Sequence, residues 1–262
     1  MKKMLFLGLC VASVVIGCKS ETKTTSQAGV YTLDKQVITD GKTDLIKSTA
    51  NGDVQYKIYT DAGYFYIGIN KDSSVGFGTG SYTQVGNTIT ETNTYNSGSL
   101  DTAWDAKVEI TNNEKGYTQV IPELKSNGVS YKLTEDYTKV QASGTSALDG
   151  IWHQTKNLVV TGKDTADKTY NEYKVYHAGH FMWATRYMSD TAAKKMTNLV
   201  GHGTFTFNND ALTEQLDFSS LKGAVGKYDI KVKFNGEDEY TQETADTATK
   251  SVGFKTYKRI KK

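Results

Sequence analysis

Short runs in which apolar and polar residues alternate recur along most of the chain, and glycine, asparagine and aspartate separate them. Clear examples are residues 64–70, 88–95, 107–111, 181–187 and 212–218. A period of two predicts half-buried β-strands, whereas no long segment shows a helical period. Residues 189–196 are the one doubtful stretch, either a short helix or a lid-like loop. The pattern predicts an all-β fold.

The strand pattern occurs twice. The sequence YKIY at 56–59 returns as YKVY at 173–176, and AGYF at 62–65 returns as AGHF at 178–181. Further along, three matches have a constant offset of 123 residues: 78–83 with 201–206, 90–91 with 213–214, and 117–119 with 240–242. Collinear matches of this kind indicate a duplicated domain. Each copy has the size at which consecutive short strands favour an antiparallel barrel, which removes exposed sheet edges.

The first eighteen residues carry a different signal. Lys2 and Lys3 precede an apolar run at 4–17 that is too short to span a bilayer and is typical of a secretory signal. Its end, Val-Ile-Gly-Cys at 15–18, resembles a bacterial lipobox, which implies a diacylglycerol anchor on Cys18. The alternative is an ordinary signal peptide followed by an unrelated cysteine. Lys19, rather than aspartate, follows the cysteine and favours the outer membrane of a bacterial cell envelope.

These observations divide the chain into five parts: a signal peptide (1–17), a lipidated tether (18–28), a first small antiparallel β-barrel (29–140), a linker (141–147) and a second barrel (148–262).

Charge and cysteine content exclude several functions. The only cysteines are Cys10, inside the predicted signal, and Cys18, so the folded part has no thiol for a disulfide, thiol catalysis or a cysteine zinc site. Of 31 lysines and arginines, the signal removes Lys2 and Lys3, and the remaining 29 balance 29 acidic residues. A neutral protein has no long-range field that attracts phosphates, so we expect no nucleic-acid partner.

Both copies resemble the small lipocalin-like domains of bacterial lipoproteins. The resemblance is carried by the Gly-Ile-Trp start at 150–152, the Gly-x-Gly-x-aromatic strand at 201–205, the Thr-Glu pair at 213–214, and Arg259 on the last strand. The first copy departs from it, with Tyr31 and Lys139 in place of Trp152 and Arg259. The resemblance implies that Arg259 stacks on Trp152 to close one end of the barrel, and that the barrel binds a small apolar or amphipathic molecule.

Aromatic side chains at alternating positions are the candidates for lining such a site. In the second copy they are Phe181, Trp183, Tyr187, Phe205 and Phe207. In the first copy they are Phe65, Tyr82 and Tyr95, together with the aliphatic Ile67. The alternative for each residue is ordinary core packing. We expect the second copy to be the binding domain, because Trp183 lies beside flexible methionines and the first copy resembles a closed, structural barrel.

The four histidines, His153, His177, His180 and His202, all lie in the second copy. Two of them form a His-x-x-His pair, which suits zinc or copper, but no carboxylate or thiol stands at a recognisable ligand spacing, and we expect no metal. Glu91 and Glu214 occupy equivalent positions, which favours a structural hydrogen bond over general acid chemistry. No catalytic motif is present. The sequence therefore predicts a non-enzymatic, cofactor-free binding protein, or alternatively a structural or interaction subunit that docks an envelope partner.

Overall fold

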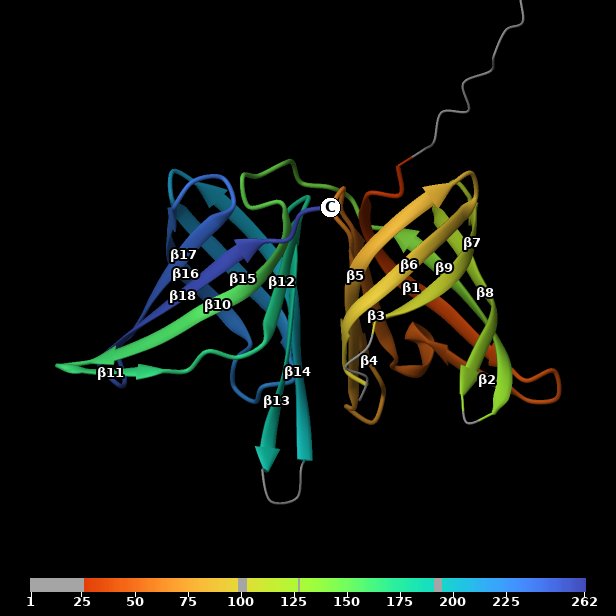
Figure 1. Ribbon diagram of the computed structural model, residues 1–262, viewed down its shortest axis with the longest axis horizontal. Helices are drawn as coiled ribbons and strands as arrows, with labels where there is room; N and C mark the ends of the chain where they lie inside the picture. The colour runs from red at the N-terminus through yellow and green to blue at the C-terminus, as the bar shows by residue number, and fades with distance from the viewer. Residues whose placement is uncertain (1–25, 99–102, 127, 191–194) are drawn as a thin grey trace, which may run out of the picture.

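The computed structural model describes residues 26–98, 103–126, 128–190 and 195–262, and these residues form two β-barrels (Figure 1). The only helical element in the described ranges is a single 3₁₀ turn, Thr49–Asn51. None of the helical segments in the described ranges has the length and hydropathy of a membrane-spanning helix. Cys18, the predicted signal and most of the predicted tether lie outside the described residues.

Barrel one is a closed ring of antiparallel strands in which consecutive strands pair and β1 returns to pair with β9. Strands β2 and β3 share one edge of β1, so the ring is eight strands around. Its strands are β1 (Gly29–Thr39), β2 (Asp44–Ser48), β3 (Val54–Tyr59), β4 (Tyr64–Ile69), β5 (Val75–Val85), β6 (Thr88–Asn96), β7 (Trp104–Asn112), β8 (Gly116–Ser126) and β9 (Val129–Lys139).

Barrel two repeats this topology, and the ring closes between β10 and β18. Residues 189–190 and 195–196 continue β13 and β14, so the described part of the doubtful stretch is a long hairpin and not a helix. The strands are β10 (Gly150–Thr161), β11 (Asp164–Asp167), β12 (Glu172–His177), β13 (His180–Asp190), β14 (Lys195–Asn208), β15 (Ala211–Ser219), β16 (Gly226–Phe234), β17 (Glu239–Asp246) and β18 (Ser251–Arg259). The prediction of two tandem antiparallel barrels is confirmed.

The pairing register corrects one detail of the repeat. Tyr59 pairs with Tyr64 across the β3–β4 turn, and Tyr176 pairs with Phe181 across the β12–β13 turn. Phe181 is therefore the equivalent of Tyr64, not of Phe65 as the shared Ala-Gly suggests. A slip of one residue moves a side chain to the other face of its strand. Phe65 consequently corresponds to Met182, and both face away from the barrel interiors.

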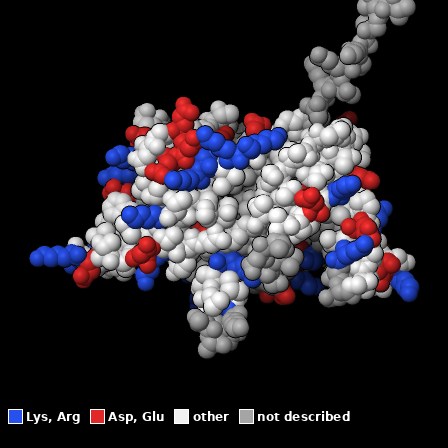
Figure 2. All heavy atoms as spheres, in the orientation of Figure 1, with Lys and Arg blue, Asp and Glu red and all other residues white. Residues whose placement is uncertain are grey.

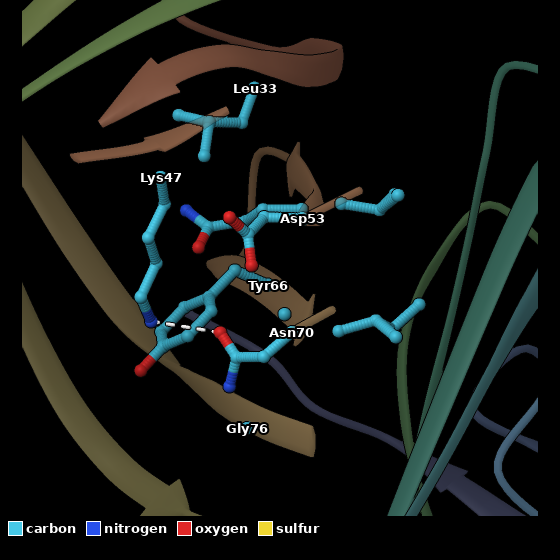
Figure 3. A pocket seen from close by; sticks show the side chains of 10 residues that line it. Leu33, Lys47, Asp53, Tyr66, Asn70 and Gly76 are labelled. Carbon is cyan, nitrogen blue, oxygen red and sulfur yellow. Dashed lines mark hydrogen bonds between the residues drawn. The ribbon is translucent and has the colours of Figure 1, made fainter. Parts of the chain in front are cut away.

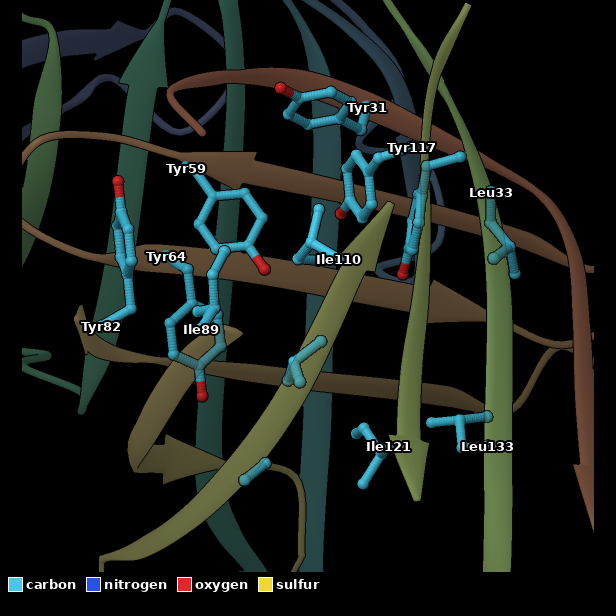
Figure 4. Close-up of a cluster of buried hydrophobic side chains, with 13 residues drawn as sticks. Tyr31, Leu33, Tyr59, Tyr64, Tyr82, Ile89, Ile110, Tyr117, Ile121 and Leu133 are labelled. Carbon is cyan, nitrogen blue, oxygen red and sulfur yellow. The ribbon is translucent and has the colours of Figure 1, made fainter. Parts of the chain in front are cut away.

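The buried side chains form three clusters, one inside each barrel and one between the barrels. Figure 4 shows the cluster that fills barrel one, built around Tyr31, Tyr59 and Tyr117. The cluster inside barrel two surrounds Trp152 and Tyr176. The third cluster draws on both copies and consists of Val30, Ile58, Phe65, Ile67, Ile69, Phe77, Ile151, Val175, Ala178, Met182, Ala184 and Val200. The outward faces of β4 and β13 therefore bury an apolar surface between the two barrels.

Aromatic stacking and hydrogen bonds support this interface. Tyr95 stacks on Tyr173 with ring centroids 4.6 Å apart, and the Tyr95 hydroxyl accepts a hydrogen bond of 2.7 Å from the backbone N–H of Arg186. Tyr56 and His202 approach to 4.0 Å between centroids. Hydrogen bonds and ring stacking depend on orientation, whereas apolar burial does not. These contacts therefore fix how one barrel is rotated against the other.

One end of each barrel is closed by a cation over an aromatic ring. The guanidinium of Arg259 lies 4.0 Å from the ring centroid of Trp152, whose indole N–H donates to the carbonyl of Leu148 at 2.7 Å. This confirms the pairing that the lipocalin-like resemblance implies. In barrel one the Lys139 ammonium lies 5.8 Å from the Tyr31 ring, a looser version of the same contact.

We expect Phe65→Ala to destabilise the whole chain. The ring is fully buried between the barrels, and truncation of a buried phenylalanine costs about 3–5 kcal/mol. The measurement is urea denaturation followed by circular dichroism. Val85→Ala is the matched control, because Val85 is 80% exposed and its truncation should change the free energy of unfolding by less than about 0.5 kcal/mol. Equal effects of the two substitutions would contradict a tightly packed interface.

Acidification should weaken the protein through His202. Burial, with a smaller contribution from His180, lowers the pKa of His202 from 6.5 to about 4. The unfolded chain therefore binds a proton between these values that the native protein does not, and stability falls as the pH drops from 6.5 toward 4, by up to about 3 kcal/mol. In His202→Phe the slope of unfolding free energy against pH should flatten. Burial also lowers the pKa of His177, so a smaller slope should remain. An unchanged slope in the variant would contradict this assignment.

Candidate functional site

Barrel two contains an open cavity of about 830 Å³. It reaches from buried side chains such as Glu214 to exposed ones such as Leu221 at the open end. The strands that line it are β10 and β12 to β18, with the connections between them. Its walls are Asn157, Val159, Tyr170, Glu172, Lys174, Trp183, Thr185, Tyr187, Leu199, Glu214, Leu216, Leu221, Ala224, Tyr228, Ile230, Gln242, Thr244, Ala245, Asp246, Thr247, Ser251, Gly253 and Lys255.

The floor of the cavity carries a buried ion pair. The Lys174 ammonium lies 2.8 Å from a carboxylate oxygen of Glu214, and the two side chains are 7% and 9% exposed. The Tyr176 hydroxyl donates to the same carboxylate and accepts a 2.9 Å hydrogen bond from the Gln242 amide. A buried charge persists only when it is paired and hydrogen-bonded, and this network supplies both conditions. Glu214 is held here by structural hydrogen bonds.

A second ion pair lies beside the first. Glu172 accepts hydrogen bonds from the Tyr257 hydroxyl and the Gln154 amide, and the Lys255 ammonium lies 3.4 Å away. Burial raises the pKa of Glu172, but the ammonium groups of Lys255 and Lys174 and the Tyr257 hydroxyl outweigh it and hold the pKa below its usual value. Glu172 is therefore an anion at neutral pH, and the floor is charged.

Apolar side chains dominate the opening. Tyr170, Leu221 and Tyr228 line it and are 43%, 50% and 39% exposed, in contrast to the buried floor. Trp183 forms part of one wall, and its indole packs closely against Gly201. A Cβ at Gly201 would lie 2.3 Å from the indole nitrogen of Trp183. The cavity is thus amphipathic, with a polar end inside and an apolar end outside.

The corresponding cavity in barrel one is much smaller. Tyr66 takes the place of Trp183, and the cavity beside it is about 160 Å³. Figure 3 shows this small cavity, in which the Lys47 ammonium donates to Asn70 at 2.8 Å.

The difference between the barrels traces to a cross-strand pair. Ile121 and Leu133 pair across β8 and β9, and both are buried in the interior of barrel one. The equivalent pair across β17 and β18 is Thr244 and Gly253. The loss of two large side chains leaves volume unfilled, because the ring of strands keeps its diameter.

A second difference concerns charge. In barrel one Glu135 occupies the position of Lys255, and its carboxylate accepts hydrogen bonds from the amides of Gln36, Gln55 and Gln119 and from the Tyr137 hydroxyl. In barrel two the carboxylate has moved to β12, as Glu172, and a lysine stands on the last strand. The sequence repeat therefore conserves architecture while the interior chemistry differs.

Two of the aromatic residues expected to line the site do so, and the others do not. Trp183 and Tyr187 line the cavity of barrel two. Phe181 and Phe205 lie below its floor, where they pack on Tyr176 in the closed core, and Phe207 packs on the edge of that core against Phe234. They fill the closed core of the barrel and do not line the cavity.

The candidates in the first copy have other places. Phe65 and Ile67 belong to the cluster between the barrels, and Tyr95 stacks across the same interface. Tyr82 is part of the filled interior of barrel one. The one-residue register difference at β4 explains Phe65 and Ile67.

The sequence analysis missed the charged floor, namely Glu172, Lys174 and Lys255. Lys174 belongs to the repeated tetrapeptide at 173–176, but the neighbouring residues do not indicate that this lysine points into the barrel. The informative signal is that Gly253 stands in the second copy where Leu133 stands in the first. The pairing register is needed to establish that the two positions are equivalent.

The histidines have structural contacts, and His177 pairs with His180 across the β12–β13 turn. His153 stacks on Tyr173 and hydrogen-bonds Asn171 at 3.0 Å, and His202 lies between Tyr56 and Phe218. His180 lies 3.4 Å from the carbonyl oxygen of Gln141. In the described part of the chain, no three histidine, cysteine or acidic side chains are placed to hold a metal together.

Comparison with known proteins gives little further guidance. No family model and no curated protein matches the chain. Among solved structures, the chain is similar to a protein of unknown function from the DUF3598 family of Nostoc punctiforme PCC 73102. The two share 10% sequence identity over 89% of this chain and 97% of that chain, with a TM-score of 0.28. A similarity this low carries no argument about function.

Proposed function

We propose that this protein is a lipid-anchored, lipocalin-like protein of the bacterial envelope in which barrel two binds one small amphipathic molecule. The observation that carries the proposal is the cavity of about 830 Å³ in barrel two, because its volume falls in the range of about 300–1,000 Å³ typical of small-molecule sites. The apolar opening suits a hydrocarbon or ring system. The charged floor suits a polar group at one end.

Barrel one serves a structural role in this proposal. Its interior is filled, and its outward face on β4 packs against barrel two. The alternative, a subunit that docks an envelope partner, draws support from this filled barrel and from Leu45 and Ile46 on β2, which are 56% and 48% exposed. On the face that Figure 2 shows, basic and acidic side chains are interspersed, which gives no extended patch of one charge for a polyanionic partner.

Substitution of cavity residues by their equivalents from barrel one should fill the cavity. We expect the double variant Thr244→Ile, Gly253→Leu to lose binding of the neutral apolar dye Nile red by at least about tenfold, a change of about 1.4 kcal/mol, because the new side chains occupy the cavity. Trp183→Ala should weaken binding as well, because it removes one wall. Binding is measured as the rise in dye fluorescence on titration of the protein.

Phe65→Ala is the control for loss of stability, since it weakens the fold without touching the cavity. This variant should bind Nile red as the natural protein does under conditions where it is folded. Equal binding by the filled double variant would contradict a site in barrel two. Absence of dye binding by the natural protein would favour the docking role.

The anchor is testable separately. Cys18→Ala removes the predicted lipid acceptor, and we expect the protein to leave the membrane fraction or to accumulate as an uncleaved precursor. The measurement is fractionation of a bacterial host followed by immunoblotting. Cys10→Ala is the control, because it leaves Cys18 in place. Normal membrane attachment of Cys18→Ala would contradict the lipobox assignment.

A further inference from the structure

The four charges in the cavity floor differ in how far solvent reaches them. Lys174, Glu214 and Glu172 have side chains that are 7%, 9% and 7% exposed, whereas the Lys255 side chain is 38% exposed. A molecule that enters the cavity therefore meets Lys255 before it meets any of the other three. The accessible charge at this depth is a cation.

Lys255 is also the most loosely held member of the floor. Its ammonium lies 3.4 and 3.5 Å from the two carboxylate oxygens of Glu172, compared with 2.8 Å for the Lys174–Glu214 pair. Glu172 already accepts hydrogen bonds from Tyr257 and Gln154. An ammonium has three N–H donors, so Lys255 retains capacity to donate into the cavity.

Lys255 differs from the equivalent interior residue of barrel one, whose polar atoms are all paired within the barrel. Barrel one closes the same position with Glu135, whose carboxylate is satisfied by three amides and a hydroxyl from its own strands. That network needs no ligand. In barrel two the same position carries a lysine that faces open volume, and the adjacent Gly253, one alternate position along β18, supplies no side chain to cover it.

The depth of these groups sets the direction of binding. The floor is buried, and the opening is lined by exposed apolar side chains such as Leu221 and Tyr228. Asp246 lies at the opening, but its carboxylate accepts hydrogen bonds from the backbone N–H groups of Ala248 and Thr249 and from the Thr249 hydroxyl. A polar head therefore finds an available charge only after it passes the opening.

From this arrangement we infer that the ligand of barrel two is an anionic single-chain amphiphile that enters head first, with its acidic group on the Lys255 ammonium and its chain along Trp183 toward the opening. The inference rests on the proposed function of barrel two and specifies its ligand class. A charge-assisted hydrogen bond to Lys255 supplies selectivity, because a neutral or cationic head cannot use the ammonium in this way.

Three probes with the same hydrocarbon chain test the charge preference: dodecanoate, dodecan-1-ol and dodecyltrimethylammonium. Each is titrated against the full chain below its solubility limit or micelle concentration, and displacement of Nile red is measured. We expect dodecanoate to bind at least about tenfold more tightly than dodecanol, consistent with a hydrogen bond to a charged group. Dodecyltrimethylammonium should bind most weakly.

Substitution then assigns the preference to one residue. Lys255→Gln should bring dodecanoate and dodecanol to within about twofold of each other, and Lys255→Arg should restore the preference, because charge and donor are retained. Lys231→Gln is the control, since Lys231 is an exposed lysine on the outer face that also pairs loosely with a glutamate, at 3.8 Å. It should leave all three affinities unchanged.

The outcomes distinguish this inference from the proposed function. Equal binding of all three probes, tighter binding of the cationic probe, or an unchanged dodecanoate preference in Lys255→Gln overturns the anionic head assignment while the cavity remains a binding site. Failure of every probe and of Nile red to bind the natural protein overturns both.

Discussion

A ring of eight strands encloses a fixed interior volume, and every second residue of each strand must either fill that volume or leave it open. Both barrels of this protein obey the same constraint with the same topology. Barrel one fills its interior with tyrosine and aliphatic side chains. Barrel two fills only the end around Trp152 and Tyr176, and Thr244 and Gly253, in place of Ile121 and Leu133, leave a cavity at the other end. The cavity of barrel two follows from this difference between the copies.

The charged groups inside the barrels follow a similar logic. Each interior holds an equivalent lysine–glutamate pair, Lys57–Glu91 at 2.6 Å and Lys174–Glu214 at 2.8 Å. Such pairs contribute little net stability, because desolvation opposes their attraction, but removal of one partner is costly. Neither pair can be replaced by apolar residues through single substitutions, because the first substitution would leave one buried charge without a partner. This constraint accounts for the presence of the pair in both copies.

Much of the architecture was predictable from the sequence. Alternation identified the strands, the collinear matches identified the duplication, and the resemblance placed Arg259 on Trp152. These features depend on local patterns or on pairs at fixed places in a repeat. The cavity residues depended on information of another kind. Whether Phe65 or Tyr64 faces inward changes with a register shift of one residue, and the shared Ala-Gly at the β3–β4 and β12–β13 turns suggested the wrong alignment. Lys255 lines the cavity beside Gly253, and the absence of a neighbouring side chain leaves no local pattern in the sequence.

Strand β13 has two functions at once. Trp183, Thr185 and Tyr187 form one side of the cavity, while Met182 and Ala184, between and beside them, are buried against barrel one. The backbone of the same strand donates from Arg186 to Tyr95 of the first copy. Strand β13 is thus the wall of the cavity on one face and part of the interface with barrel one on the other. Any outward displacement of that wall must therefore also disrupt buried contacts with barrel one, so the first copy, although filled, restrains the shape of the cavity in the second.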